Sequence, residues 1–335
     1  MNTKNNWILK DKTFDKSKWM QIPRDVVAGH GVIKQIPDII TDLGINGNIL
    51  VLSGPNTMKT TGARVIEYLK ERTVYSSEVG KITYDEVRRI EEYAKDKEIK
   101  LIAAVGGGRV IDTAKVVSYN LDIQFISIPT AASHDGIASS RASISTDNGS
   151  VSVAAHPPIA IIADTEILSK APRRLMASGY ADMIANYTAI LDWRLSIDKN
   201  GEKGSEYAET LSLITSTLMV KNADKIKEFD ENAAWIVVKA LFASGIAMSI
   251  AGSSRPASGG EHKFAHMLEI IAPGKALHGE ACGIGSIISM YLHGGEWRRI
   301  RNALKIIGAP TKPTDLGLAD DDVIEAIMRA HEIRP

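Results

Sequence analysis

Three separate segments of the chain carry side chains that suit one metal ion. They supply one carboxylate, at Asp182, and three imidazoles, at His262, His266 and His278. One aspartate and two histidines as ligands leave at least one coordination position open, and an open position separates a catalytic divalent metal from a structural one. The pattern therefore indicates a metal that acts as a Lewis acid.

The paired histidines carry most of this inference. A single helical histidine is more often a hydrogen-bonded structural residue than a ligand, but His262 and His266 lie four residues apart, on one face of a helix expected to begin at 258–261. Zinc proteases use a similar pair, yet here the glutamate precedes the first histidine, which disfavours a protease. Cys282, four residues beyond His278, stays open as a soft ligand, although small buried cysteines are common.

A second group of residues suits an anion. Gly106, Gly107 and Gly108 follow an apolar run at 101–105 and precede a helical stretch, so that bare N–H groups and a helix N-terminus can face a phosphate. The alternative is a glycine turn needed only for chain reversal. The polar segment 129–136 follows the next strand, at the edge of a parallel sheet where ligands bind. Two such loops favour a dinucleotide over a lone phosphate.

These residues need a scaffold that brings them together. The first half alternates short β-branched apolar runs with helical stretches, which is typical of parallel strands joined by crossover helices. Strands are expected at 48–52, 73–79, 101–105 and 124–128, helices at 62–70 and 83–97, and a hairpin at 139–154 turned at Asp147-Asn148-Gly149. Beyond 168, apolar residues recur at helical spacing in 176–195, 207–219, 235–250 and 284–291, with a loop at 198–204.

The expected fold class is therefore an α/β N-terminal, Rossmann-like domain with a parallel sheet, over 1–167, followed by an all-helical C-terminal domain over 168–335. A chain of 335 residues is long enough for two such cores. Lys+Arg and Asp+Glu both total 40, so net charge gives no reason to expect nucleic acid or an anionic membrane as partner. One cysteine excludes an internal disulfide, and the polar start at 1–7 shows no signal-peptide core, so we expect a cytoplasmic protein without membrane insertion.

Taken together, the motifs resemble a known superfamily. Gly-Gly-Gly-x-x-x-Asp-x-x-Lys from Gly106, Pro-Thr-x-x-Ser-x-Asp from Pro129, and the aspartate and histidines above are similar to those of glycerol dehydrogenase, iron-containing alcohol dehydrogenase and dehydroquinate synthase. Within it, the segments 22–31, 129–139 and 254–262 resemble the archaeal sn-glycerol-1-phosphate dehydrogenase family, and the resemblance covers nearly the whole chain.

The resemblance implies a dehydroquinate synthase-like fold and reduction of dihydroxyacetone phosphate to sn-glycerol 1-phosphate by NAD(P)H, for archaeal ether lipids. It implies one divalent metal, usually Zn²⁺, on Asp182, His262 and His278, and a homo-oligomer. Asp135 and His266 would be the catalytic residues and, with Asp182, would contact the substrate. The cofactor residues would be Gly106, Gly107, Gly108, Arg109, Val110, Asp112, Thr130, Ser133 and Ser139.

Several alternatives stay open at this point. The chain could be a glycerol dehydrogenase or another polyol dehydrogenase, an enzyme of the dehydroquinate-synthase type, or a non-enzymatic regulator that has kept the fold. Basic residues near the motifs are few, which favours a small substrate, and they are the candidates for a substrate phosphate: Arg141, Arg255, Lys263 and Lys275. Asp112 and Lys115, three apart on a helix, could equally be a simple surface pair.

The segment 53–59 bears on the choice of cofactor. Discrimination against a 2′-phosphate usually comes from an acidic residue at the end of an early strand. This segment contains no carboxylate and includes Lys59. We therefore expect NADPH to be accepted at least as well as NADH.

Overall fold

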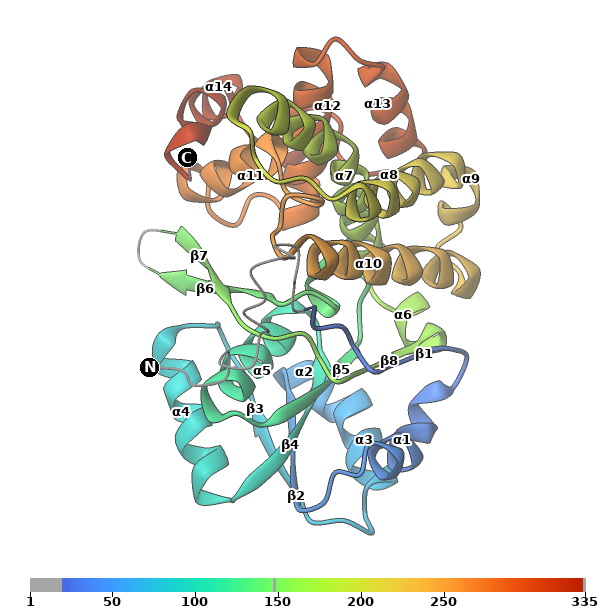
Figure 1. The fold of residues 1–335 in the computed structure, drawn as a ribbon. Helices are drawn as coiled ribbons and strands as arrows, with labels where there is room; N and C mark the ends of the chain where they lie inside the picture. Colours follow the sequence, from blue (N-terminus) through green and yellow to red (C-terminus); the bar gives the residue numbers. More distant parts are fainter. Residues whose placement is uncertain (1–19, 147–148, 334–335) are drawn as a thin grey trace, which may run out of the picture.

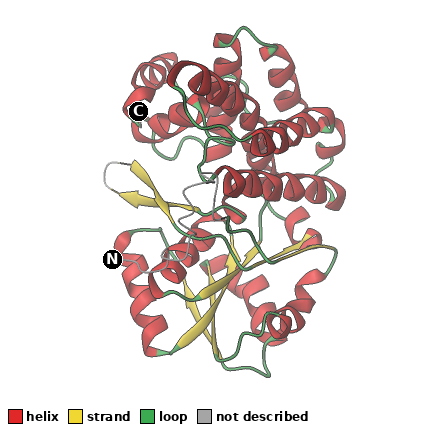
Figure 2. Ribbon diagram, viewed as in Figure 1, coloured by secondary structure: helices red, strands yellow, loops and turns green. Residues whose placement is uncertain are grey.

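The structure is a computed structural model that describes residues 20–146 and 149–333. One half is a parallel sheet covered by helices, and the other consists of helices (Figures 1 and 2). The sheet strands are β1 (Asp25–Gly29), β2 (Asn48–Ser53), β3 (Val74–Glu78), β4 (Ile99–Gly106), β5 (Gln124–Pro129) and β8 (Ala160–Asp164). They run parallel in the order β1-β8-β5-β4-β2-β3, which confirms the expected α/β architecture.

Helices cover both faces of this sheet, which is why its central strands are apolar along their whole length. Alternate residues of β2 show the two faces. Ile49 and Val51 belong to a core formed with α1 (Ile36–Asp42) and α3 (Ala63–Tyr68). Leu50 and Leu52 belong to the core on the other face, formed with α4 (Tyr84–Asp96) and α5 (Gly108–Leu121). The short helix α2 (Pro55–Thr57) follows β2.

The carboxyl ends of β4 and β5 lie side by side, as the sequence predicted. Gly106 at the end of β4 pairs with Pro129 at the end of β5. The Thr130 N–H then donates to the Gly106 carbonyl at 3.0 Å. This register brings the glycine loop and the polar loop after β5 to one edge of the sheet.

The predicted hairpin is present between the two halves. It consists of β6 (Arg141–Thr146) and β7 (Gly149–Ala154), paired antiparallel from Arg141↔Ala154 to Thr146↔Gly149. Of its predicted turn, Asp147 and Asn148 lie outside the described residues. Strand β6 packs on α5 of the sheet half and β7 packs on α11 (Gly260–Ile271) of the helical half (Figure 1).

A long central helix, α7 (Arg173–Asn200), organises the helical half. Around it lie α8 (Glu206–Lys221), α9 (Ala223–Ile226), α10 (Glu231–Ala251), α12 (His278–Leu292), α13 (Trp297–Ile306) and α14 (Asp320–Arg329), with α6 (Thr165–Ser169) leading in from the sheet. The loop expected at 198–204 was partly wrong, because α7 continues to Asn200. Gly201, at φ 65°, then ends the helix in the left-handed conformation that glycine adopts easily.

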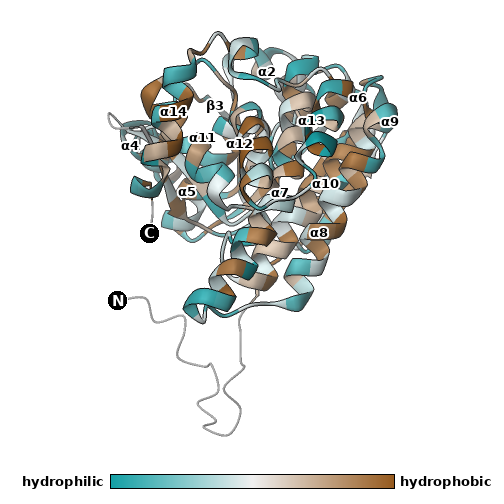
Figure 3. Cartoon of the chain, turned by 90° about the horizontal axis from the view of Figure 1, so that it is seen from above, coloured by the Kyte–Doolittle hydropathy of each residue, from teal (hydrophilic) through white to brown (hydrophobic). Residues whose placement is uncertain are grey.

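Helix α10 is long and apolar enough to cross a membrane by length and composition alone. Within the fold, however, 67% of its most apolar stretch is buried. Seen from above, it lies among the other helices of this half (Figure 3). Its apolar character is that of a core helix, and its side chains join the largest hydrophobic cluster, which also contains residues of the sheet half.

Candidate metal and cofactor site

One cavity of about 220 Å³ between the two halves is lined by six of the residues predicted to do chemistry: Asp112, Asp135, Ser139, His262, His266 and His278. Asp182 and the glycine loop 106–108 are not on its wall. The loop after β5, the hairpin and three helices of the other half, α10, α11 and α12, contribute to the wall. Its lining includes His134, Asp135, Ser139, Arg141, Ser152, His262, His266 and His278. Segments more than 100 residues apart in the sequence therefore meet at a single site.

Asp182, His262 and His278 come together as predicted, from three helices. Asp182 lies in the buried middle of α7, His262 in the first turn of α11, and His278 is the first residue of α12. Asp182 Oδ1 is 3.5 Å from His262 Nε2 and 3.7 Å from His278 Nε2. Ligand atoms about 2.1 Å from a zinc ion at tetrahedral angles lie about 3.4 Å apart, so these separations fit a shared ion.

The hydrogen bonding of Asp182 also fits a metal ligand. Its Oδ2 accepts from the Asp135 N–H at 3.1 Å. Its Oδ1 is buried and has no hydrogen-bond partner among the described residues. A buried carboxylate oxygen without a donor is costly unless a cation satisfies it. The three residues thus fit a divalent metal.

Cys282 lies in the same cluster. Its Sγ is 3.6 Å from His278 Nε2, and it can join Asp182, His262 and His278 in a group whose ligand atoms all lie within 4.8 Å of one another. Burial raises the pKa of the thiol to about 11, so it is protonated at neutral pH in the protein without metal. The spacing of four residues on α12 explains its position beside His278.

Glu261 is a functional residue that the sequence reasoning did not identify. This buried carboxylate accepts from His262 Nδ1 at 2.9 Å through Oε1 and from the Thr188 hydroxyl at 2.8 Å through Oε2. A histidine held by its Nδ1–H presents the lone pair of Nε2, which faces Asp182. The signal for this role in the sequence was the position of the glutamate, directly before a ligand histidine.

The beginnings of the two helices that carry ligand histidines, α11 and α12, are also fixed by carboxylates. Glu280 accepts from the Leu277 N–H at 2.8 Å and forms a two-pronged ion pair with Arg174, at 2.6 and 2.7 Å. It thereby holds the turn that presents His278. At the start of α11, Asp192 accepts from the Gly260 N–H, two residues before His262.

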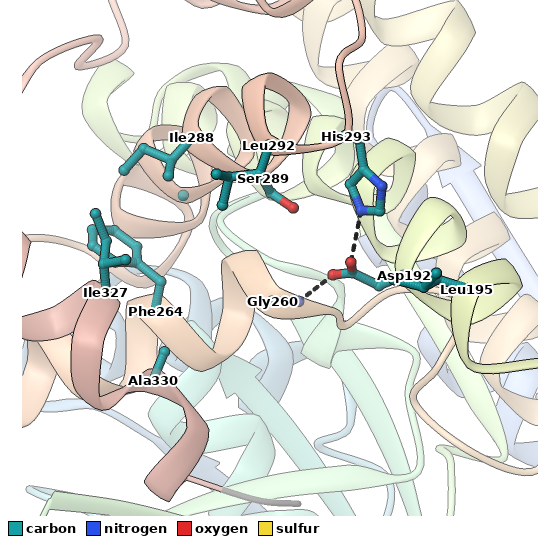
Figure 4. Close-up of a pocket in the computed structure, with 11 residues that line it drawn as sticks. Asp192, Leu195, Gly260, Phe264, Ile288, Ser289, Leu292, His293, Ile327 and Ala330 are labelled. Carbon is teal, nitrogen blue, oxygen red and sulfur yellow. Dashed lines mark hydrogen bonds and ion pairs between the residues drawn. The ribbon is translucent and has the colours of Figure 1, made fainter. Parts of the chain in front are cut away.

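A second cavity, of about 340 Å³, lies beside the start of α11 (Figure 4). Its walls are mainly aliphatic, and Asp192 and His293, joined at 2.7 Å, stand at one end. None of the residues predicted to act in catalysis lines it. A side-chain carbon at Gly260 would lie 3.1 Å from Asp192 Oδ2, so the absence of a side chain allows the close approach of that carboxylate.

Asp135 follows β5 and faces Asp182. Its Oδ2 accepts from the Ser244 hydroxyl at 2.9 Å. Desolvation and the charge of Asp182 raise the pKa of Asp135 to about 6. Desolvation opposes ionisation of Asp182 as well, but the close approach of His262 and the charges of His278 and His262 lower its pKa to about 2. The pKa values of the two neighbouring carboxyls are thus shifted in opposite directions.

The three histidines differ in their surroundings. Desolvation lowers the pKa of His278 to about 4, despite the charge of Asp182. For His262, burial is outweighed by interactions with Cys282, Asp182 and Glu261, which raise its pKa. His266, one turn further along α11, has its ring centre 6.4 Å from that of His262 and 5.4 Å from that of His278. It lines the cavity beside the cluster, where the sequence predicted a substrate contact.

The predicted cofactor residues gather at the carboxyl edge of the sheet. Gly106 ends β4, Gly108 begins α5, and Thr130 and Ser133 follow β5, with Ser139 before the hairpin. Arg109, Val110 and Asp112 lie in the first turns of α5. A side-chain carbon at Gly108 would overlap the His134 ring, at 2.0 Å from Nε2, so glycine is required there by close packing.

Asp112 and Lys115 are not a surface pair, and that alternative was wrong. Lys115 is fully buried, and its Nζ is 3.0 Å from Asp112 Oδ1. The hairpin covers them, since Lys115 also donates to the Arg141 carbonyl at 2.6 Å and the Ser143 N–H donates to Asp112 Oδ2 at 3.1 Å. Both carboxylate oxygens of Asp112 are therefore engaged within the protein.

The fold is that of the glycerol dehydrogenases and iron-containing alcohol dehydrogenases. Residues 27–172 match the family model for iron-containing alcohol dehydrogenase. The fold is similar to a probable glycerol dehydrogenase from Sinorhizobium meliloti 1021, with TM-score 0.80 and 21% identity over 95% of this chain and 91% of that one. Glycerol dehydrogenase from Schizosaccharomyces pombe gives TM-score 0.80 and 20% identity over 96% and 84%.

Sequence relatives narrow the class further. The chain is 70% identical over 335 residues, 100% of its length and 93% of the relative's, to glycerol-1-phosphate dehydrogenase (NAD(P)+) from Methanocorpusculum labreanum. It is 58% identical over 331 residues, 98% and 91% of the two lengths, to the protein of the same name from Methanoregula boonei. The chain belongs to the glycerol-1-phosphate dehydrogenase family. The resemblance drawn from its motifs is confirmed, and the chain is an NAD(P)-dependent oxidoreductase.

Proposed function

We propose that this chain reduces dihydroxyacetone phosphate to sn-glycerol 1-phosphate with NAD(P)H, for the backbone of archaeal membrane ether lipids. One observation carries the proposal. Asp182, His262 and His278 are spaced as ligands of one ion, and both histidines line the same cavity as Asp135 and the loop that follows β5. The names of the relatives from Methanocorpusculum labreanum and Methanoregula boonei support the choice of substrate.

The proposed metal is Zn²⁺, held by Asp182, His262 and His278. Carboxylate and imidazole donors suit zinc, and three protein ligands leave a position for substrate. When bound, the metal would act as a Lewis acid on the substrate carbonyl, while the nicotinamide would supply hydride to the adjoining carbon. Glu261 and Glu280 would hold His262 and His278 in place during the reaction.

Proton supply is the proposed role of His266 and Asp135. The carbonyl oxygen gains a proton as the alcohol forms, and a side chain that donates it must line the cavity beside the ligands. Both residues do so. With its pKa raised to about 6, Asp135 holds a proton more readily near neutral pH than an ordinary aspartate does. We assign proton transfer to His266, directly or through water ordered by Asp135.

The remaining assignments follow from position. The loop from Gly106 to Val110, with Asp112, Thr130, Ser133 and Ser139, is proposed to hold the cofactor, because it lies at the ligand-binding edge of a parallel sheet. The cofactor domain is proposed to span 1–167 and the metal- and substrate-binding domain 168–335. We also propose a cytoplasmic homo-oligomer, with no nucleic-acid partner.

Comparing two substrates tests the proposal. With NADPH, dihydroxyacetone phosphate should exceed dihydroxyacetone in catalytic efficiency by about a hundredfold or more, which corresponds to roughly 2.7 kcal/mol from one or two charge-assisted contacts. The oxidation of NADPH, followed by its absorbance, measures both rates. Equal efficiencies would favour the second candidate, a glycerol dehydrogenase, which the structural neighbours make the natural alternative.

A further inference from the structure

The charged groups around the site cavity distinguish one side chain from all the others. Among the described residues that line it, Arg141 is the one lysine or arginine. The other ionisable side chains on its wall are carboxylates, at Asp112, Asp135 and Glu269, and imidazoles. Carboxylates repel a phosphate, so the permanent positive charge that the lining side chains offer an anionic substrate comes from the hairpin.

The other basic residues considered from the sequence do not line this cavity. Arg255 is directed to a carboxylate instead, with its Nε 2.8 Å from Glu202 Oε1. Lys263 and Lys275 are absent from the cavity wall as well. Proximity in sequence to the metal motif, which made these three residues candidates, does not bring their cationic groups to the site.

The guanidinium of Arg141 is held by neutral acceptors. Its Nε donates to the Ser152 hydroxyl at 3.2 Å and its Nη2 donates to the Ser152 carbonyl at 3.1 Å. No carboxylate among the described residues forms an ion pair with it. The side chain is thus oriented across the hairpin, no described carboxylate neutralises its charge, and a planar guanidinium can bind two oxygens of a phosphate at once.

The backbone of Arg141 is fixed from the other side. The buried Lys115 donates to the Arg141 carbonyl, and Asp112 accepts the Ser143 N–H, so that α5 holds β6 at two nearby points. Replacing a buried ion pair with apolar residues is often neutral or stabilising, so such a pair is weak evidence of stability. Here it fixes the position of a strand.

The hairpin also contacts the helix of the metal ligands. Strand β7, which carries Ser152, packs against α11, which carries His262 and His266 (Figure 1). The phosphorus of dihydroxyacetone phosphate is three bonds from its carbonyl carbon. The side chain that binds this phosphate must therefore line the same cavity as the ligand histidines without being a metal ligand itself. Arg141 meets this condition.

We propose that Arg141, presented by the β6–β7 hairpin, binds the phosphate of the substrate. The inference rests on the proposed function, since the phosphate is part of that substrate. It explains how a chain with no net charge selects an anionic substrate. Arg141 is a specificity-determining residue on this view, whereas Lys115 and Asp112 are positioning residues.

The test compares Arg141→Ala with Arg255→Ala as a matched control and Arg141→Lys as the conservative variant. The ratio of catalytic efficiencies for dihydroxyacetone phosphate over dihydroxyacetone should fall by about 10- to 100-fold in Arg141→Ala, as expected for one charge-assisted contact. Arg255→Ala should keep the wild-type ratio, and Arg141→Lys should lie between the two. Inorganic phosphate, used as a competitive inhibitor, should bind more weakly to Arg141→Ala. Metal content and melting temperature establish that each variant is folded.

The possible failures are distinguishable. An unchanged ratio in folded Arg141→Ala overturns this inference and leaves the proposed function standing. A raised KM for NADPH in Arg141→Ala, with an unchanged ratio between the two substrates, also overturns this inference, because it shows that Arg141 binds the cofactor. A wild-type enzyme without preference for the phosphorylated substrate overturns the proposed function, and this inference with it.

Discussion

At the scale of single residues, the site is built from a few buried charges that depend on one another. Asp182 lies between two imidazoles, and Glu261 holds one of them from behind. Asp182 and Glu261 both raise the pKa of His262, which favours a proton on that ring in the protein without metal. Binding a metal must displace this proton, which couples metal affinity to pH.

Removal of single ligands tests the assignment of the ion. Alanine at Asp182, His262 or His278 should abolish metal binding and activity together, because each variant lacks a donor atom. His266→Ala should retain the metal while losing much of its rate, since it lines the cavity without being assigned as a ligand. Metal content, measured by elemental analysis beside the rates, decides the matter. Metal loss in His266→Ala as severe as in His262→Ala would show that His266 is a ligand.

Asp135 gives a prediction about stability and pH. Its folded-state pKa, about 6, is raised from an ordinary 3.8, so the folded state binds its proton more tightly than the unfolded state does. The protonated Asp135 carboxyl therefore contributes to the free energy of unfolding below about pH 4, and this contribution is lost as pH rises through about 6. Asp135→Asn, which resembles the protonated form, should therefore stabilise the metal-free protein at pH 7 by about 3 kcal/mol. The gain should shrink at pH 5. Denaturant unfolding in the presence of a chelator measures both values, and an equal gain at both would contradict the assigned cause.

At the scale of elements, the site depends on where helices begin. His262 and His278 lie at the starts of α11 and α12, and carboxylates fix both starts. Asp192 and Glu280 accept from backbone N–H groups there, while Glu261 bonds the ligand histidine itself. Helix beginnings leave N–H groups without internal partners, and acceptors that satisfy them also fix the adjoining side chains.

Glu261 is the most direct test of this support. Glu261→Ala removes the acceptor of His262 Nδ1–H and should weaken metal affinity by about 10- to 100-fold. Glu261→Gln keeps one acceptor oxygen and should recover part of that affinity. Titration with Zn²⁺ against a competing chelator gives the affinities. If Glu261→Ala bound zinc as tightly as wild type, the role assigned to this residue would be wrong.

The elements differ in how far their sequences predict them. The central strands β2, β4 and β5 were predicted because burial on both faces leaves continuous apolar runs. Strands β1 and β8 were not predicted, although β8 is buried along its whole length, whereas β1 is only partly buried. The resemblance to known motifs predicted the ligand set of Asp182, His262 and His278, whereas spacing alone indicated the helical pair His262 and His266. It did not predict the burial of Lys115, because an i, i+3 pair has the same pattern on a surface or under a hairpin.

At the scale of the whole molecule, the proposed reaction requires two halves, one for the cofactor and one for the metal. The carboxyl edge of the sheet carries the proposed cofactor residues, and the helices carry the proposed ligands. The hairpin contacts both halves, so it closes the cavity between them. Because cofactor and metal would approach the substrate from fixed directions, hydride would reach one face of the carbonyl carbon, and the product would be one enantiomer.

The configuration of the product tests this account most directly. The zinc-loaded enzyme is supplied with dihydroxyacetone phosphate and NADPH, and the glycerol phosphate formed is analysed for chirality, with enzyme stripped of metal as the control. The account predicts sn-glycerol 1-phosphate from the loaded enzyme and no product from the stripped enzyme. Formation of sn-glycerol 3-phosphate, of both enantiomers, or of product without metal would contradict it.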